Sequence, residues 1–500
     1  MNIKAISAAL KISLWSLLFL TLVLSCAKDD APTPVIPVEP TPVSKDVTAH
    51  DFMWKAMNLW YFWQADIADL ADNRFATDKV YSDYLQAQGE PDAFYNDKLL
   101  FSEDRFSFLN ADYKELVQSF QGISKSNGLE FGLSLFSGTE NVYGYVRYIV
   151  PGSNAATVDI SRGEIFTGVD GKTLNLENYQ ELLFGPNDSY TLNMASIENN
   201  TITTNGKSVN LTKEANLSEN PVFLTRVIET GGQKTGYIMY NGFTSNYNEQ
   251  LNQAFGSLKS AGVTDLVMDM RYNPGGSVNT SRLLASMIYG TDTNKLYIRQ
   301  RWNSKIQPQL SSSQLEDYFA NSTGQTPINS LGLSRVFVIA TGSSASASEL
   351  VMNGLDPYME VIHIGTTTRG KNEFSITLVD IPSNSFIYDS TKESGINSKN
   401  LWGIQPLVGR NENANGFFDY TTGFIPDYEL REVLSNYGIL GSPTEPLLAK
   451  ALSLITGNTN KAVNYDLKSE FQLNEFDNSK RHSPLKERMI LDKNIDLIVE

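Results

Sequence analysis

One stretch of small residues has the composition of a turn that could carry a nucleophile. It reads Thr341-Gly342-Ser343-Ser344-Ala345-Ser346-Ala347-Ser348-Glu349. An apolar stretch precedes it, and helical periodicity begins within it. A serine where a strand turns into a helix exposes its hydroxyl above the sheet edge, next to the N–H groups of the helix terminus. Serines at helix starts also act as simple N-caps, so this stretch alone does not assign a nucleophile.

A nucleophilic serine needs a base, and the chain has only three histidines. His50 lies in an N-terminal helical stretch, His363 in an apolar strand and His482 in a polar tail. A Ser-His-Asp triad is therefore not expected. A buried lysine can act instead, because burial disfavours the ammonium form and lowers its pKa. Lys371 lies 25 residues after Ser346, and a parallel strand-helix-strand unit returns the chain to the same sheet edge.

A glycine-rich loop is the third element with chemical potential. It reads Asp269-Met270-Arg271-Tyr272-Asn273-Pro274-Gly275-Gly276 and follows an apolar strand. Two successive glycines let backbone N–H groups face a ligand without an intervening Cβ atom. The loop could donate to a developing oxyanion, and it could equally be an ordinary turn.

These three motifs together resemble the S41 family of serine peptidases, the carboxy-terminal processing or tail-specific proteases. The resemblance rests on residues 269–276, Ser344 to Glu349 and Gly370-Lys371, in that order. Phe424 to Asp427 is similar to the close of the family's catalytic domain, and the likeness covers about residues 47–457. It implies a serine-type peptidase that acts on protein or peptide substrates.

The resemblance also implies roles for individual residues. Ser346 would be the nucleophile and Lys371 the general base of a Ser/Lys dyad. The oxyanion donors would be the backbone N–H groups of Ala347 and of Gly275 or Gly276. Several family members carry a glutamine four residues after the lysine, where this chain has Ser375, whose hydroxyl could still orient the amine. This departure supports an alternative, a catalytically weak or inactive surface lipoprotein that binds peptides on the same fold.

A second module follows from the same resemblance. Gly128 to Gly171 resembles the PDZ domain of these enzymes, which would bind the C-terminal tail of a substrate by strand addition. The candidate peptide-binding loop comprises Leu129, Glu130, Phe131 and Gly132. The module could instead be only a spacer or a lid.

The elements that must position these residues form a multidomain chain with α+β and α/β parts. A length of 500 residues predicts about three domains. Strands alternate with helices from about residue 223 onward, which is typical of a largely parallel sheet with helical cover. The resemblance implies a ClpP/crotonase-like catalytic domain. The predicted segments are a signal peptide (1–25), a Pro-rich tether (26–46), a helical domain (47–121), a PDZ-like β-rich domain (122–213), the S41 catalytic domain (214–457) and a polar, loosely packed C-terminal tail (458–500).

The N-terminus indicates export. Lys4 and Lys11 precede an uncharged stretch, residues 12–24, which is too short to span a membrane and typical of a signal peptide. Ser25-Cys26 then resembles a bacterial lipobox, so Cys26, the only cysteine, is the expected lipid attachment point. The alternative is a plain cleaved signal. We expect an outer-membrane lipoprotein of the cell envelope, similar to Bacteroidetes members, either periplasmic or surface-exposed.

Composition excludes several other classes. The net charge of −16 disfavours nucleic-acid backbones and peripheral binding to anionic lipid, so membrane contact would come through the lipidated N-terminus only. One cysteine allows no internal disulfide. No carboxylate or histidine cluster has ligand spacing, so no metal or cofactor is expected.

Overall fold

The computed structural model describes residues 45–198, 201–457, 473–482, 487–493, 495 and 497. From Asp46 onward the described residues belong to one compact unit. The predicted signal peptide, the lipid attachment at Cys26 and nearly all of the tether lie outside the described residues, and these predictions stay predictions.

A six-stranded sheet forms the centre of the α/β part. Its five parallel strands confirm the predicted largely parallel sheet, and one antiparallel strand is added at the edge. In spatial order the strands are β10 (Val222–Thr230), β11 (Gln233–Tyr240), β12 (Asp265–Asp269), β16 (Arg335–Ala340), β17 (Glu360–Gly365) and β22 (Tyr428–Glu429).

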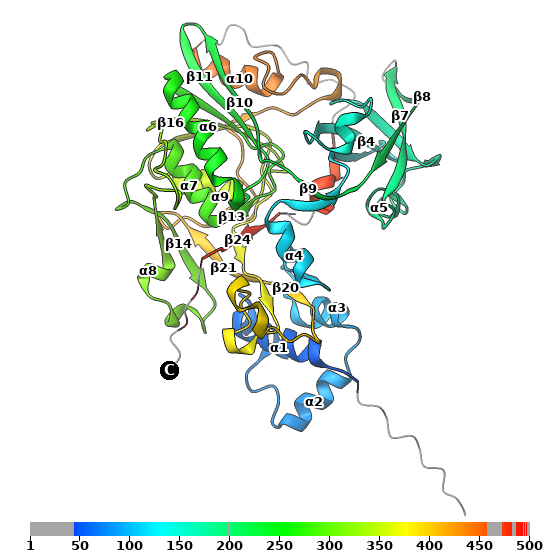
Figure 1. Cartoon of the computed structure of the whole chain (residues 1–500), viewed down its shortest axis with the longest axis vertical. Helices are drawn as coiled ribbons and strands as arrows, with labels where there is room; N and C mark the ends of the chain where they lie inside the picture. Colours follow the sequence, from blue (N-terminus) through cyan, green and yellow to red (C-terminus); the bar gives the residue numbers. More distant parts are fainter. Residues whose placement is uncertain are drawn as a thin grey trace, which may run out of the picture. The chain divides into compact units, whose positions relative to one another are not determined.

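Helices cover both faces of this sheet because its apolar residues alternate between two cores. Met268 and Val338 face a core shared with α6 (Asn248–Ala261), α7 (Val278–Ile288) and α9 (Ala347–Leu355) (Figure 1). Val267 and Phe337 face a second core, which is closed by α10 (Pro446–Ile455).

The N-terminal part is only partly helical. Its helices are α1 (Thr48–Trp60), α2 (Asp78–Gln86), α3 (Pro91–Phe94) and α4 (Tyr113–Phe120). Trp60 and Tyr61 are buried, so these aromatic side chains of the N-terminal part belong to the packed core. Before α4 the chain forms β1 (Phe108–Asn110), which pairs with β20 (Gly403–Gln405), and β20 pairs in turn with β19 (Leu378–Val379).

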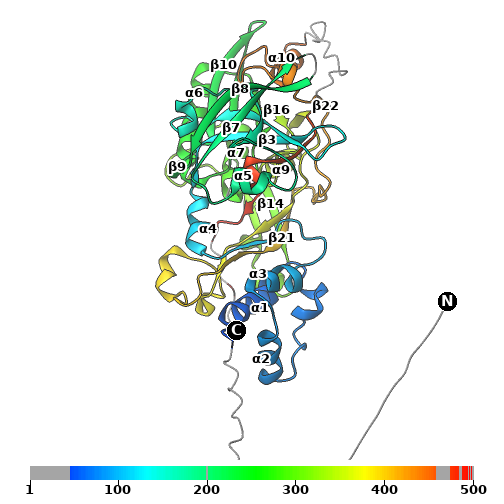
Figure 2. The ribbon, with the colours of Figure 1, turned by 90° about the vertical axis from the view of Figure 1, so that its right-hand side faces the viewer.

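The β-rich module is a twisted antiparallel sheet with a short helix, α5 (Tyr179–Phe184), packed on it (Figure 2). Its strands are β3 (Leu129–Leu135), β4 (Val142–Ile149), β5 (Ile165–Val169), β6 (Lys172–Thr173), β7 (Ser189–Glu198) and β8 (Thr201–Thr212). Asp170 and Gly171 have positive φ angles and form the hairpin turn between β5 and β6. Leu129 to Gly132, predicted as a loop, is instead the buried start of β3, because both of its edges are paired.

The tail was expected to pack loosely, and for its described residues this expectation is wrong. β23 (Glu475–Asn478) pairs with β3, and the one-turn helix α11 (Ser479–His482) follows it. β24 (Met489–Ile490) joins a further sheet between two strands of the catalytic part. In order this sheet contains β13 (Gly276–Ser277), β24, β18 (Glu373–Ser375), β21 (Leu407–Glu412), β14 (Leu296–Trp302) and β15 (Glu316–Tyr318). The polar side chains of the tail pack well because charged side chains from the rest of the chain pair with them.

Candidate active site

Ser346 lies in the turn between β16 and α9, at the carboxyl edge of the parallel sheet. Its φ of 64° is in the left-handed region, which is uncommon for a residue other than glycine and marks a strained turn. The strain is held by two hydrogen bonds, from Ser346 N to the Glu349 carboxylate (2.7 Å) and from Leu350 N to Ser346 O (2.8 Å). The hydroxyl was expected to be exposed, but Ser346 is fully buried. Its Oγ has no hydrogen-bond partner among the described residues.

Lys371 lies in the loop that leads from β17 to β18, and its side chain is buried. Burial lowers its pKa to about 8, against the attraction of nearby carboxylates such as Glu373. Its Nζ atom donates to the backbone carbonyl of Glu487 (2.5 Å) and lies 4.9 Å from the centroid of the Phe106 ring. A lysine with this lowered pKa becomes neutral as pH rises through about 8, well below the range of an exposed lysine, and the neutral amine is the form that acts as a base.

Glu349 connects the two turns, a role that was not predicted from the sequence. Its Oε2 accepts from the N–H groups of Ser346 (2.7 Å) and Lys371 (2.9 Å). Its Oε1 accepts from Gly370 N (2.7 Å) and Thr368 Oγ1 (2.5 Å). Burial raises the pKa of Glu349 to about 7, although these hydrogen bonds favour the ionised form. Its position in the first turn of the Ser346 helix was the available signal.

The glycine loop lies directly against Ser346. A Cβ atom on Gly275 would be 2.7 Å from Ser346 Cβ and 2.4 Å from the Arg488 carbonyl oxygen, so only glycine fits. Gly276 N donates to that same Arg488 carbonyl (2.5 Å), whereas Gly275 N donates to Asn273 Oδ1 (2.9 Å). Ala347 is the first residue of α9, so its N–H has no acceptor within the helix.

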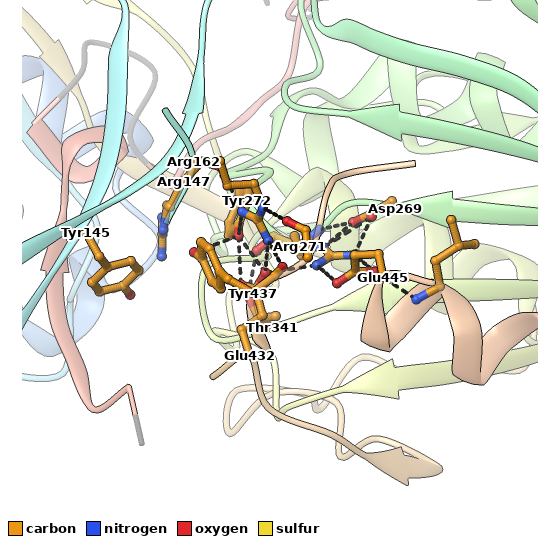
Figure 3. A network of polar contacts seen from close by, with 12 residues as sticks. Tyr145, Arg147, Arg162, Asp269, Arg271, Tyr272, Thr341, Glu432, Tyr437 and Glu445 are labelled. Carbon is orange, nitrogen blue, oxygen red and sulfur yellow. Dashed lines mark hydrogen bonds and ion pairs between the residues drawn. The ribbon is translucent and has the colours of Figure 1, made fainter. Parts of the chain in front are cut away.

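A buried ionic network fixes the start of the glycine loop (Figure 3). Arg271 is fully buried and pairs with Asp269, Glu432 and Glu445. The Arg271 carbonyl accepts from Thr341 Oγ1 (2.5 Å), which ties the loop to the Ser346 turn. Arg162 also pairs with Glu432, so every carboxylate of the network has a cationic partner, and the network can hold both turns at one sheet edge.

The remaining predicted residues lie elsewhere. Ser375 Oγ donates to Met489 O (3.2 Å) and accepts from Gln405 Nε2 (3.0 Å). Its predicted lysine-orienting contact is not present, since Lys371 Nζ bonds to Glu487. Leu129 to Gly132 belong to the β-rich module, where Gly132 pairs with the chain's own β23 and Phe131 N donates to Ser479 Oγ just beyond it. Ser346, Ala347, Gly275, Gly276 and Lys371 are therefore the predicted residues that come together.

A parallel α/β sheet that carries a serine turn, a buried lysine and a glycine loop at one edge has the groups of a serine hydrolase site. Residues 234–406 match the model of peptidase family S41, and residues 49–108 match the peptidase S41 N-terminal domain. The chain therefore carries a peptidase S41 domain and a peptidase S41 N-terminal domain.

Individual relatives agree with this assignment. A crystal structure described as an S41 protease from Bacteroides fragilis NCTC 9343 is 27% identical, with a TM-score of 0.63, and covers 81% of this chain and 97% of that one. The carboxyl-terminal-processing protease of Picosynechococcus sp. is 24% identical over 61% of this chain and 65% of its own length. The chloroplastic C-terminal processing peptidase of Tetradesmus obliquus is 26% identical over 60% of each chain. The chain thus spans less than two thirds of these curated relatives.

Proposed function

We propose that the chain is a serine endopeptidase in which Lys371 acts as general base for Ser346. One observation carries the proposal: the groups expected to handle a peptide already hold one. The carbonyls of two successive residues, Glu487 and Arg488, accept from Lys371 Nζ and from Gly276 N (2.5 Å each). A polypeptide segment therefore fits beside the serine turn, with one backbone carbonyl bound by the base and the next by the glycine loop.

In acylation, Ser346 Oγ attacks the carbonyl carbon of the substrate while the neutral amine of Lys371 takes its proton. The oxyanion of the tetrahedral intermediate accepts hydrogen bonds from the N–H groups of Gly276 and Ala347, and one such donor contributes about 10²–10³-fold in rate. The C–N bond then breaks, and the Lys371 ammonium gives its proton to the departing amine. In deacylation, water gives a proton to Lys371, attacks the ester carbon and releases Ser346 Oγ, which regains a proton from the ammonium.

Glu349 acts as a positioning residue in this mechanism. One of its oxygens holds the backbone N–H groups of both Ser346 and Lys371, so the nucleophile and the base keep a fixed relation. The ionic network around Arg271 does the same for the glycine loop. Such preorganisation is needed because small displacements of catalytic groups cost large factors in rate.

Protein tails are the substrate class that we propose. The free edge of β3, beyond its pairing with β4, accepts an antiparallel strand, as β23 demonstrates. Strand addition on such an edge recognises the backbone of an extended peptide. The two curated relatives carry names that describe carboxyl-terminal processing. The PDZ-like module would then deliver a tail to Ser346.

A serine-reactive fluorophosphonate and an unfolded protein such as casein test the proposal. We expect Ser346→Ala to abolish both labelling and proteolysis, and Lys371→Ala to slow both by at least about 10²-fold, the range typical of a lost general base. Ser257→Ala and Lys259→Ala are matched controls, because both side chains are exposed on α6. Proteolysis that survives Ser346→Ala contradicts the proposal.

A catalytically silent peptide-binding protein is the second candidate. Ser375 does not orient Lys371, whose amine points to Glu487 O. Peptide binding without labelling of any form of the chain would favour this candidate over the peptidase.

We also propose that Cys26 carries a lipid that anchors the mature protein to the outer membrane. The support is the sequence pattern that ends at Ser25-Cys26. In the part of the chain that the structure describes, no helix is long and apolar enough to cross a membrane. Metabolic labelling with an alkyne fatty acid tests this, with Cys26→Ser as the variant that should lose both label and membrane fraction.

A further inference from the structure

The segment formed by residues 473–482 and 487–493, here called the trailing segment, pairs with the β-rich module in its first half. β23 runs antiparallel to β3, with Asn478 opposite Gly132 and Glu475 opposite Ser134. Just beyond β23, Ser479 Oγ accepts from Phe131 N (3.0 Å). This is the geometry of strand addition, so the predicted peptide-binding residues already hold a peptide from the same chain.

The second half of the trailing segment crosses the candidate active site. β24 runs parallel to both β13 and β18, between which it lies. Leu491 N continues this pairing by donating to Ser375 O (3.0 Å). Just before β24, the carbonyls of Glu487 and Arg488 bond to Lys371 Nζ and Gly276 N. Ser346 is inaccessible to solvent in this arrangement.

Side chains at both ends anchor the trailing segment. Glu475 pairs with the buried Arg147 of β4 and accepts from Ser343 Oγ (3.1 Å) in the serine turn. At the other end, Asp492 accepts from Ser277 Oγ (2.6 Å) and Asn279 N (3.2 Å). Further ion pairs join Lys480 to Glu130 and Glu219, Arg369 to Glu487 and Lys493 to Asp317.

We propose that the trailing segment is a built-in peptide ligand whose two described parts occupy a peptide-binding track, one at β3 and one at Ser346, and that it keeps the chain latent until it is displaced. The latency rests on the proposed peptidase function, whereas the occupancy of the track does not. Any polypeptide that acts as substrate must compete with this segment for the same backbone donors and acceptors. The segment therefore shows the direction and the pairing of a bound substrate.

One residue makes the resident ligand imperfect and therefore displaceable. The guanidinium of Arg488 lies 4.3 Å from the Phe108 ring centroid and 4.8 Å from that of Phe120, and burial lowers its pKa to about 9. It donates to Ser119 Oγ (3.2 Å), but its Nε has no partner and it pairs with no carboxylate among the described residues. A buried cation without a counter-ion costs free energy, so a peptide with an uncharged side chain here has an advantage.

The first experiment measures the rate of fluorophosphonate labelling. A chain ending at residue 472 should react at least about tenfold faster than the full chain, because an open state populated to about 10% or less limits the latter. Glu475→Gln and Asp492→Asn in the full chain should each accelerate labelling, since they weaken opposite ends of the segment and neither residue is a proposed catalytic group. Asp66→Asn, at an exposed position, is the matched control and should change nothing. Thermal unfolding checks that each variant folds.

The second experiment is independent of catalysis. A fluorescent peptide of residues 473–493 should bind the Ser346→Ala chain ending at residue 472 saturably, as measured by anisotropy. A peptide with Glu475→Lys and Asp492→Lys should bind at least about tenfold more weakly, because each lysine faces the partner of a lost carboxylate. If the shortened chain does not fold, hydrogen exchange replaces binding: Glu475→Gln in full-length Ser346→Ala should deprotect Phe131 and Gly276.

The outcomes separate the two proposals. If the peptide binds, or hydrogen exchange changes, while fluorophosphonate labels none of the variants, the result would support the track and overturn the peptidase function. Equal labelling of all folded forms, with no change in exchange, would overturn the track. Ser346-dependent cleavage of the chain between Arg488 and Met489 would also support the track, since it places that carbonyl at the nucleophile.

Discussion

The side-chain amine of Lys371 donates a hydrogen bond of 2.5 Å to the backbone carbonyl of Glu487, 116 residues further along the chain. The proposed base is thus engaged by the chain's own polypeptide and not by Ser346. Because the next carbonyl, that of Arg488, accepts from the Gly276 N–H, two of the proposed catalytic groups are occupied together. Displacing a single segment would free both, so the resting chain and the active one need differ only in where that segment lies.

Gly275→Ala should inactivate the site. The added Cβ would approach the Arg488 carbonyl to 2.4 Å and Ser346 Cβ to 2.7 Å, at a φ of +105°. Loss of the loop geometry should lower kcat/KM on casein by about 10²–10³-fold, the value of one oxyanion donor. Gly324→Ala is the control, since it has a similar φ of +100° and no atom within 4 Å of the new Cβ. Equal losses in both variants would mean that backbone strain alone is responsible.

Glu349→Gln should reduce both stability and activity. The amide nitrogen would face N–H donors in place of an acceptor, since both carboxylate oxygens are engaged. We expect a loss of about 1–3 kcal/mol in the free energy of unfolding, the cost of unsatisfied buried polar groups. Urea denaturation measures it, with Glu360→Gln on the exposed side of β17 as control. If Glu349 is a positioning residue, kcat should fall while KM for casein stays nearly constant. A general loss of folded protein would also leave KM unchanged, so kcat is normalised to the concentration of titratable Ser346.

Activity should rise with pH through about 8. Burial lowers the Lys371 pKa to about 8, so protonation below that value removes the base. A bound peptide buries the lysine again, so kcat, which reports the enzyme–substrate complex, should show this pKa. In the chain ending at residue 472, the pH profile of kcat/KM should show a higher pKa for Lys371, because the empty site is less buried. A kcat that is flat or falls between pH 7 and 9 would contradict a lysine base.

The Lys371 shift also predicts a pH dependence of stability. Its folded-state pKa of about 8 lies below the usual lysine value of 10.5, so the unfolded chain binds more protons between about pH 8 and 10.5. The contribution of this group to the free energy of unfolding therefore increases as pH rises through that window. Comparing the full chain with Lys371→Met by urea denaturation at pH 7.5 and 9.5 isolates it. The difference between the two chains should shift in favour of the wild-type chain at the higher pH.

Arg488→Leu should make the chain more latent. Leucine fills the space beside Phe108 and Phe120 without a buried charge, so the trailing segment should dock more tightly. We expect slower fluorophosphonate labelling and a gain of about 1–4 kcal/mol in stability, the range for replacing buried ionic groups by apolar ones. Arg431→Leu, on a half-exposed arginine, is the control. Faster labelling by Arg488→Leu would show that the guanidinium helps to hold the segment.

The sequence by itself determined the main elements of the α/β part and the turns that meet at the edge of its sheet. The apolar run 335–340 and the periodic stretch 248–260 appear in the structure as β16 and α6, because the local pattern of apolar residues records which sides of an element are buried. The approach of Lys371 to the Ser346 turn followed from the order of a parallel strand-helix-strand unit. The resemblance to peptidase family S41 followed from the same three motifs.

Only the tertiary structure decided what covers that site. β13 and β24 have two residues each, too short to carry any periodic pattern, and their pairing joins positions more than 200 residues apart. The polar residues after 472 look solvated in the sequence. Their partners come from distant parts of the chain: Glu475 pairs with Arg147, and Asp492 accepts from Ser277. Glu349 and Ser375 obtained their contacts in the same way. Hydrophobic periodicity is a local signal, whereas the partner of a charge or of an unpaired strand edge is set by the fold.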